Sequence, residues 1–357
     1  MLNSPAKLFS LFLLCIVLFV KYNNSGFVTA ANSIGMNYGL LGNNFPLPST
    51  VINLFKSIKV TKIRIFNPNT EVLNALRGRR EFQVMVGVRD EELAHLKISE
   101  ENSLTNLVKS RNLTISISTV VASDVKKGLK LQGWPGSFKY LGPGPNSKLV
   151  FGGPSLYTAG PGWVYKPFLT SLVVAMTNLA QSYPPSNGTF TSLGREQLVP
   201  VLQLLSQTRT PILVNIYPYF AYADDPKSIR LDYATFNART VVVQDRQLGY
   251  SNLFDAIFDA FVWAMEKEGV KGLPMVVSET GWPSAGNGSL TTPDIAGTYN
   301  RNFVQHIRSG KGTPKRPNNG MDGYIFTTFN ENKKPAGVEQ NFGLYNPSDM
   351  KPIYKLF

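Results

Sequence analysis

The sequence is poor in the side chains that most often bind metals or form disulfides. It contains one cysteine, Cys15, and two histidines, His95 and His306. A single cysteine excludes an intrachain disulfide, and both histidines fall in predicted helices without the spacing of metal ligands. No glycine-rich phosphate-binding motif follows the first predicted strand, which argues against a dinucleotide-binding fold. We therefore expect no metal site, no cofactor and structural roles for both histidines.

Long apolar runs are also scarce, and the clearest one lies at the start of the chain. Residues 8–20 are almost entirely apolar and follow Lys7, and small residues occupy positions 28–31. The run is too short to span a bilayer but has the length of a signal-peptide core. The alternative, a membrane anchor, would need a longer run. We expect residues 1–31 to be a secretory signal peptide, cleaved near Ala30 or Ala31, and the protein to have no membrane span after cleavage.

Acidic residues are outnumbered, 23 against 36 basic ones, giving a net charge of +13. Removal of residues 1–31 takes away Lys7 and Lys21 and leaves +11. The basic clusters at 77–80 and 311–316 are too short for a nucleic-acid-binding arm. We therefore expect no nucleic acid partner, and interpret the charge as a solvated surface suited to an acidic cell wall. Sequons at Asn112, Asn187 and Asn287 are compatible with glycosylation.

Beyond the leader, strand patterns alternate with helix patterns. Strands are predicted at 34–39, 62–66, 82–88, 115–121, 211–214, 275–279 and 323–328, and helices at 51–58 (capped by Ser49), 71–76, from Asp90, 195–207, from Asn252, and 294–309. Such alternation with short turns predicts a parallel sheet. Because these seven strands nearly reach the eight of a closed barrel, we expect a closed (β/α)8 TIM barrel, an α/β fold formed as a single domain by residues 32–357.

In such a barrel the chemistry lies at the carboxyl ends of the strands. Tyr38, Asn67, Tyr217, Glu279 and Glu331 all fall at predicted strand ends. Glu279 ends an apolar strand, where an ionised carboxylate is costly unless partners or function hold it. An aromatic residue follows three positions later, at Trp282, and pairing of carboxylates with aromatic rings is typical of sites that bind sugars. A solvated loop glutamate beside a core strand is the alternative.

Several segments resemble the plant endo-1,3-β-glucanases, glycoside hydrolase family 17. The resemblance covers residues 34–98 and 183–357, in family order, through the segments IGMNYGLLGNNFPLPS, KIRIFNPN, SYPPSNGTF, LVNIYPYFAY, LDYATF, VVQDRQLGYSNLFDA, VVSETGWPSAG, GTPKRP and FNENKKPAGVEQNFGLY. It implies a TIM-barrel glycosidase that hydrolyses 1,3-β-glucan, such as callose or fungal wall polymer. It also implies a role in plant defence, secretion to the extracellular space or cell wall, and a monomer.

The resemblance also implies roles for individual residues. Glu279 matches the family's nucleophile. Glu331 and Lys334 match residues that line the cleft and support the nucleophile electrostatically; an ordinary surface ion pair is the alternative. The positions that match substrate-stacking aromatics of the cleft are Tyr38, Tyr217, Tyr219, Trp282 and Phe342.

The chain departs from the family pattern in its middle. The family carries its acid/base glutamate in a Val-Gly-Asn-Glu motif that ends the fourth strand, and no such motif occurs here. One alignment puts Pro154 at the acid position and another leaves the motif deleted near residues 142–144. Between Glu101 and Glu196 the only acidic residue is Asp124. It follows residues 115–121, which resemble the family's fifth strand, so we expect a barrel that is irregular around strands four and five.

Two functions therefore stay open. The first is a retaining endo-hydrolase of 1,3-β-glucan with Glu279 as nucleophile and an unidentified acid. The second is a secreted 1,3-β-glucan-binding protein with weakened catalysis, which keeps the cleft without the proton donor that speeds departure of the sugar.

Overall fold

The computed structural model describes residues 32–88, 116–122 and 169–357. The predicted signal peptide, the helix expected from Asp90, His95, Asp124 and Pro154 lie outside these residues. No helix of the described part is long and apolar enough to cross a membrane.

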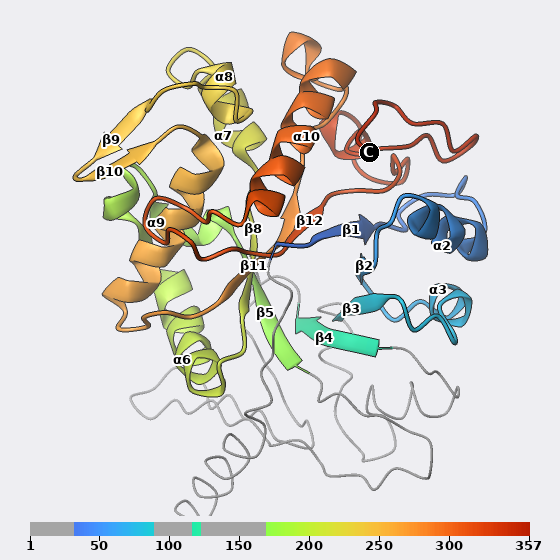
Figure 1. Ribbon diagram of the computed structural model, residues 1–357, viewed down its shortest axis with the longest axis horizontal. Coiled ribbons are helices and arrows are strands. Elements are labelled where there is room, and N and C mark those ends of the chain that lie inside the picture. Colours follow the sequence, from blue (N-terminus) through green and yellow to red (C-terminus); the bar gives the residue numbers. More distant parts are fainter. Residues whose placement is uncertain (1–31, 89–115, 123–168) are drawn as a thin grey trace, which may run out of the picture. The chain divides into compact units, whose positions relative to one another are not determined.

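Within the described residues, eight parallel strands form a closed barrel (Figure 1). They follow the order β1-β12-β11-β8-β5-β4-β3-β2 around the ring, so chain neighbours are barrel neighbours. The strands are β1 (Ile34–Tyr38), β2 (Lys62–Ile65), β3 (Gln83–Val88), β4 (Ser116–Ala122), β5 (Leu169–Ala175), β8 (Ile212–Asn215), β11 (Met275–Thr280) and β12 (Gly323–Ile325). The predicted TIM barrel is confirmed.

The middle of the chain completes the barrel in an order that the sequence did not predict. Residues 115–121 resemble a fifth strand, but β4 occupies the fourth position because it pairs with β3, from Gln83 opposite Ser116 to Val88 opposite Ala122. On its other side β4 pairs with β5, which supplies the fifth strand. Between β3 and β4 the register shifts after Val84. The fourth and fifth positions are therefore both filled by strands in parallel pairing.

Helices connect the strands, and four of the seven described have a side-chain N-cap, at Asn69, Thr191, Asn252 and Thr292. Those of the described residues are α2 (Pro48–Ser57), α3 (Thr70–Ala75), α6 (Ser192–Thr208), α7 (Pro218–Asp224), α8 (Leu231–Ala234), α9 (Leu253–Lys267) and α10 (Pro293–Ser309). The predicted cap Asn252 is confirmed, since its side chain accepts from the Asp255 backbone N–H. The predicted cap Ser49 is wrong: α2 begins at Pro48, whose fixed φ suits the first helical position.

Short elements complete the described chain. The 3-10 turns are η2 (Met176–Asn178), η3 (Pro185–Asn187), η4 (Gly288–Leu290) and η5 (Val338–Gln340). Two antiparallel pairs lie outside the barrel, β6 (Leu179–Gln181) with β7 (Thr189–Phe190) and β9 (Val243–Asp245) with β10 (Leu248–Tyr250). The last barrel strand, β12, is shorter than the 323–328 predicted from sequence, and the backbone of Thr327 and Thr328 instead forms hydrogen bonds with residues 342–345.

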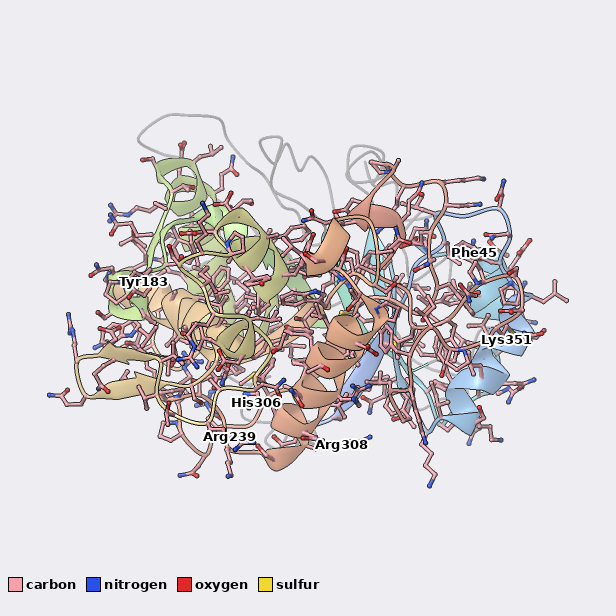
Figure 2. The ribbon with its side chains drawn as sticks, turned by 90° about the horizontal axis from the view of Figure 1, so that it is seen from above. Phe45, Tyr183, Arg239, His306, Arg308 and Lys351 are labelled. Atoms are coloured by element: carbon pink, nitrogen blue, oxygen red, sulfur yellow. The ribbon has the colours of Figure 1, made fainter. Side chains whose placement is uncertain are left out.

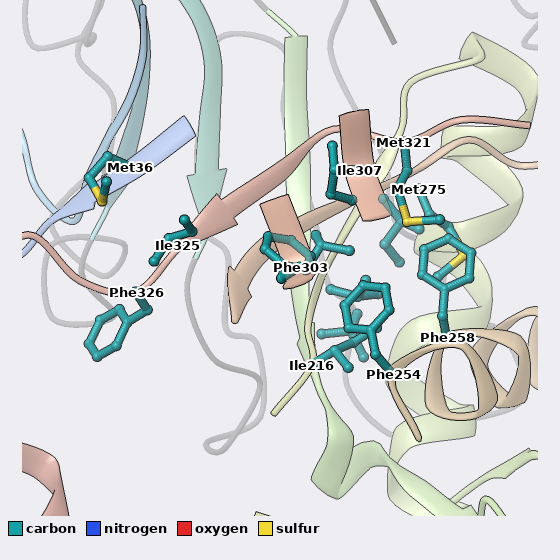
Figure 3. Packing of buried hydrophobic residues seen from close by; sticks show 14 of the residues in the cluster. Met36, Ile216, Phe254, Phe258, Met275, Phe303, Ile307, Met321, Ile325 and Phe326 are labelled. Carbon is teal, nitrogen blue, oxygen red and sulfur yellow. The ribbon is translucent and has the colours of Figure 1, made fainter. Parts of the chain in front are cut away.

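The main hydrophobic core lies between the sheet and the helices. Figure 3 shows Phe254 and Phe258 of α9 and Phe303 and Ile307 of α10 among strand residues such as Met275. The spacing of these helix residues, three or four positions apart, is what places them on one face of each helix.

A second, smaller core fills the inside of the barrel. Met85, Val173, Leu213 and Tyr324 come from β3, β5, β8 and β12 and contact one another, with Val276 of β11 packed against them. Side chains from so many strands can meet only across the barrel interior. Gly35 of β1 leaves room for this layer, since a Cβ there would lie 2.4 Å from the Tyr324 ring. The interior is thus packed, and the site must lie above it.

A buried ion pair closes the amino end of the barrel. Lys62 begins β2, and its Nζ lies 2.6 Å from a carboxylate oxygen of Asp322, directly before β12. The other oxygen accepts from the Ser33 backbone N–H at 3.1 Å and hydroxyl at 2.6 Å. Both charged side chains are at most 10% exposed.

Breaking this pair should destabilise the barrel without touching the opposite end. Lys62→Met leaves Asp322 buried without its cation, and we expect a loss of about 3 kcal/mol in the free energy of unfolding. The double variant Lys62→Met, Asp322→Leu leaves no buried charge and should recover most of that loss. Urea denaturation would measure both variants, and equal stability of the single variant and the parent would contradict a buried, uncompensated Asp322.

Candidate active site

Glu279 lies near the carboxyl end of β11, the seventh barrel strand, and two side chains bind its carboxylate. Arg64 of β2 donates from Nη1 to Oε1, and the Tyr217 hydroxyl donates to Oε2 at 2.9 Å. The Glu279 side chain is 13% exposed, whereas that of Arg64 is 2% exposed. Both oxygens are therefore held in place, while the Glu279 side chain stays partly exposed.

Arg64 is fixed from several sides. Its Nη1 also donates to the Ser278 carbonyl at 3.1 Å and to Asn37 Oδ1 at 3.4 Å, and its guanidinium lies 4.6 Å from the centre of the Phe66 ring. A buried guanidinium needs such partners. Its direct contact with Glu279 makes it an electrostatic partner for the ionised carboxylate.

Tyr217 follows β8 and begins α7 as its N-cap. Burial raises the pKa of its hydroxyl, and the negative charge of Glu279 raises it further. The hydroxyl therefore stays protonated at neutral pH and remains a donor to Glu279. Its ring packs edge-on against Phe326 and Phe342 at centroid distances of 6.2 and 5.7 Å. Tyr217 thus contacts Glu279 directly and is only partly buried, and its predicted role in substrate stacking stays a prediction.

Glu331 and Lys334 form a second charged pair in the loop after β12. Lys334 Nζ lies 3.1 Å from Glu331 Oε2 and 4.2 Å from the centre of the Phe326 ring. The other oxygen of Glu331 accepts from the Leu41 backbone N–H at 2.9 Å. Glu331 is 2% exposed, and a Cβ at Gly39 would lie 2.4 Å from its carboxylate. The pair is therefore buried, unlike an ordinary surface ion pair.

Phe326 connects the two charged groups. Its ring contacts Phe66, which lies beneath Arg64, at 6.0 Å, and also contacts Tyr217 and Phe342. Lys334 lies over the same ring. Glu279 and the Glu331–Lys334 pair are thus brought to the same end of the barrel, as the sequence predicted.

Four of the five predicted stacking aromatics are buried in the structure. Tyr38, Tyr219, Trp282 and Phe342 are at most 2% exposed. Trp282 is fully enclosed, because Tyr219, Tyr222 and Tyr299 pack around it and its indole N–H donates to the Leu290 carbonyl at 2.9 Å. A ring without a free face cannot stack on a sugar, so this arrangement does not agree with the predicted stacking role and gives these rings a structural one.

Sequence reasoning missed an exposed aromatic next to this group. Phe220 of α7 is 41% exposed and contacts the rings of Tyr217, Tyr219 and Phe342 at 5.5, 5.2 and 6.2 Å. It also missed Arg64, although a charged residue in the middle of the strand KIRI was a visible signal. A buried arginine inside a short barrel strand needs an anionic partner, which here is Glu279.

His306, labelled on α10 in Figure 2, has structural partners. Its ring packs against Phe236 and Phe254, and its Nε2 lies 2.9 Å from an Asp255 oxygen. Within residues 32–88, 116–122 and 169–357, no cluster of three or more His, Cys, Asp or Glu side chains could hold a metal ion.

Comparison with known proteins identifies the family of the chain. The model of glycosyl hydrolases family 17 matches residues 34–115 and 169–357, which include β11 and the loop of Glu331. It leaves out 116–168, the segment that contains β4 and Asp124.

Individual relatives extend the match. The chain is 65% identical over 360 residues to the probable glucan endo-1,3-beta-glucosidase BG4 of Arabidopsis thaliana. It is 63% identical over 369 residues to the probable glucan endo-1,3-beta-glucosidase BG5 of the same plant. Both matches cover 100% of this chain and 100% of the relative. Among solved structures, CJP38, a beta-1,3-glucanase and allergen of Cryptomeria japonica pollen, superposes with a TM-score of 0.74 at 35% identity, over 90% of this chain and 98% of that one. The chain therefore belongs to glycosyl hydrolases family 17.

Proposed function

We propose that this protein is a secreted endo-hydrolase of 1,3-β-glucan that works with retention of configuration and uses Glu279 as its nucleophile. The observation that carries the proposal is the Glu279 carboxylate itself, held by Arg64 and Tyr217 at the carboxyl end of the seventh strand. The names of the relatives and the solved glucanase support the substrate class. We propose residues 1–31 as the signal peptide, residues 32–357 as the mature barrel, and a monomer as the working unit in the cell wall.

Each named side chain has a task in this reaction. Glu279 attacks the anomeric carbon while the glycosidic bond to the departing sugar breaks, and water then hydrolyses the resulting glycosyl-enzyme. Tyr217 and Arg64 hold the carboxylate, which gives up its negative charge to the anomeric carbon as the covalent bond forms. Glu331 and Lys334 keep a fixed electrostatic field beside the site, which is most effective in a water-poor environment. The reaction needs no cofactor.

The proton donor is the incomplete part of this mechanism. The family carries its acid/base glutamate in a Val-Gly-Asn-Glu motif, and this chain lacks that motif. Asp124 is the only acidic residue between Glu101 and Glu196. β4 ends at Ala122, two residues before Asp124 along the chain. Asp124 lies outside the described residues, so its candidacy rests on this sequence position alone.

A second candidate function follows from the same departure. Without a proton donor, a barrel that keeps Glu279 and its cleft would bind 1,3-β-glucan and cleave it poorly. This alternative is a secreted glucan-binding protein with weakened catalysis. The substrate class is common to both functions and can be tested first.

Insoluble 1,3-β-glucan should retain the protein, whereas cellulose should not, since its straight chain differs in shape from a curved 1,3-glucan. Phe220→Ala should weaken retention by on the order of 1 kcal/mol, because Phe220 is the exposed ring beside Tyr217. Phe357→Ala, another exposed aromatic that is not part of this ring group, is the matched control. Co-sedimentation at increasing salt would measure the effect.

Equal retention on both polymers would contradict this proposal. So would retention that moderate salt abolishes, because binding through the net positive charge is screened within about 10 Å at 0.1 M salt.

A further inference from the structure

The strand that carries Glu279 leaves regular pairing immediately before that residue. On one side, β11 pairs with β8 in register up to Val277, after which Glu279 rather than Ser278 stands opposite Asn215. On the other side, the register with β12 shifts between Val277 and Thr280. Ser278 is thus the extra residue of a β-bulge. Such bulges occur next to active sites, where they redirect a side chain.

The carbonyl of Ser278 is bound by side chains from two other strands. Asn37 of β1 donates to it from Nδ2 at 3.1 Å, and Arg64 of β2 donates from Nη1 at 3.1 Å. Neither strand neighbours β11 in the barrel, because β12 lies between β1 and β11. The two side chains therefore reach across the barrel interior to the bulge.

Asn37 is itself fixed on every side. It is fully buried, and its Nδ2 also donates to the Ile325 carbonyl of β12 at 3.2 Å, while Oδ1 accepts from Arg64. Its backbone carbonyl accepts from the hydroxyls of Thr327 and Thr328 at 3.0 and 2.7 Å. A side chain so constrained can fix the position of the carbonyl that it binds.

We propose that Asn37 is a positioning residue for the nucleophile: it holds the Ser278 bulge and orients Arg64, and so aims the Glu279 carboxylate. The proposal rests on the proposed role of Glu279. Asn37 touches neither the substrate nor the reacting atoms and acts through Ser278 and Arg64. A shift of about 1 Å in a reacting group can cost about 100-fold in rate, so even a small relaxation of the bulge has a measurable effect.

Two variants remove different hydrogen-bonding groups of Asn37. Asn37→Leu removes the donors to Ser278 and the acceptor for Arg64. Asn37→Asp keeps the shape and the acceptor but, when ionised, loses both N–H donors. With a dinitrophenyl glycoside of a 1,3-β-linked glucose disaccharide, we expect both variants to form the glycosyl-enzyme about 10- to 100-fold more slowly, with KM changed less than about twofold. The burst of dinitrophenolate measures this step.

Asp322→Asn is the control for lost stability, because it disturbs a buried polar cluster at the opposite end of the barrel. It should lower the urea midpoint without changing the burst rate. Parent-like burst rates in both Asn37 variants would overturn the proposal, while loss of the burst in Glu279→Gln would still support the proposed function.

Crystal structures of Asn37→Leu and of the parent would test, independently of activity, whether Asn37 holds the bulge. We expect the Ser278 carbonyl and the Glu279 carboxylate to move relative to the barrel in the variant. If both groups superpose on the parent, Asn37 does not hold the bulge, whatever the kinetics show.

Discussion

Glu279→Gln is expected to abolish formation of the glycosyl-enzyme. A glutamine amide cannot supply the negative oxygen that attacks the anomeric carbon, so the rate with an activated 1,3-β-glucoside should fall by roughly 10⁴-fold or more. Because the amide can still occupy the space between Arg64 and Tyr217, binding of the glucan should change far less than the rate. Mass spectrometry of the trapped intermediate and the burst of the released phenolate would measure the loss.

The control for this variant removes the same charge from the surface. Asp349→Asn alters a carboxylate that is 43% exposed and pairs with Lys351, so it should leave the rate unchanged. An intermediate that still forms on Glu279→Gln would mean that another residue is the nucleophile. An intermediate trapped on a peptide other than the one that contains Glu279 would mean the same.

The fold was predictable from the sequence because a barrel repeats one pattern. Apolar strands and amphipathic helices alternate, and the structure confirms strands such as β2 and β3 and helices such as α9 within a few residues. The pattern could not predict which place in the strand order of the barrel residues 115–121 would take. Their likeness to a fifth strand reflects local composition, whereas the pairing of Ser116–Ala122 with β3, a tertiary property, makes them the fourth.

The site was predictable only in part. A carboxylate at the end of an apolar strand indicated Glu279, and its role as nucleophile stays a prediction. Substrate stacking by the aromatic residues could not be predicted from sequence alone. A ring that follows a strand can face the cleft or pack beneath the next loop, and the sequence is the same in both cases. Trp282 packs beneath its loop, with its N–H bound to Leu290. Asn37 gave no signal, since its role arises from a bulge two strands away.

The chemistry of the leaving group distinguishes the two proposed functions. A departing sugar alkoxide needs a proton in the transition state, whereas a dinitrophenolate or fluoride leaves without one. If the acid is missing and Glu279 is intact, the polymer should be cleaved about 10²- to 10⁴-fold more slowly than by a complete enzyme. A 1,3-β-glucan oligosaccharide with an activated leaving group should still form the glycosyl-enzyme.

Breakdown of that intermediate should then limit turnover, because the absent residue would also have activated the water. Azide attacks without a base, so it should accelerate turnover and yield a β-configured glycosyl azide, identified by NMR.

Rapid hydrolysis of the unactivated polymer would instead mean that the chain holds an acid, and Asp124→Asn would be the first variant to test. Loss of polymer cleavage in that variant, with activated substrates still reacting, would identify Asp124 as the proton donor. If no activated sugar reacts at all, Glu279 does not act as a nucleophile, because a working nucleophile would form the glycosyl-enzyme with these substrates even without an acid. The protein is then a glucan-binding protein.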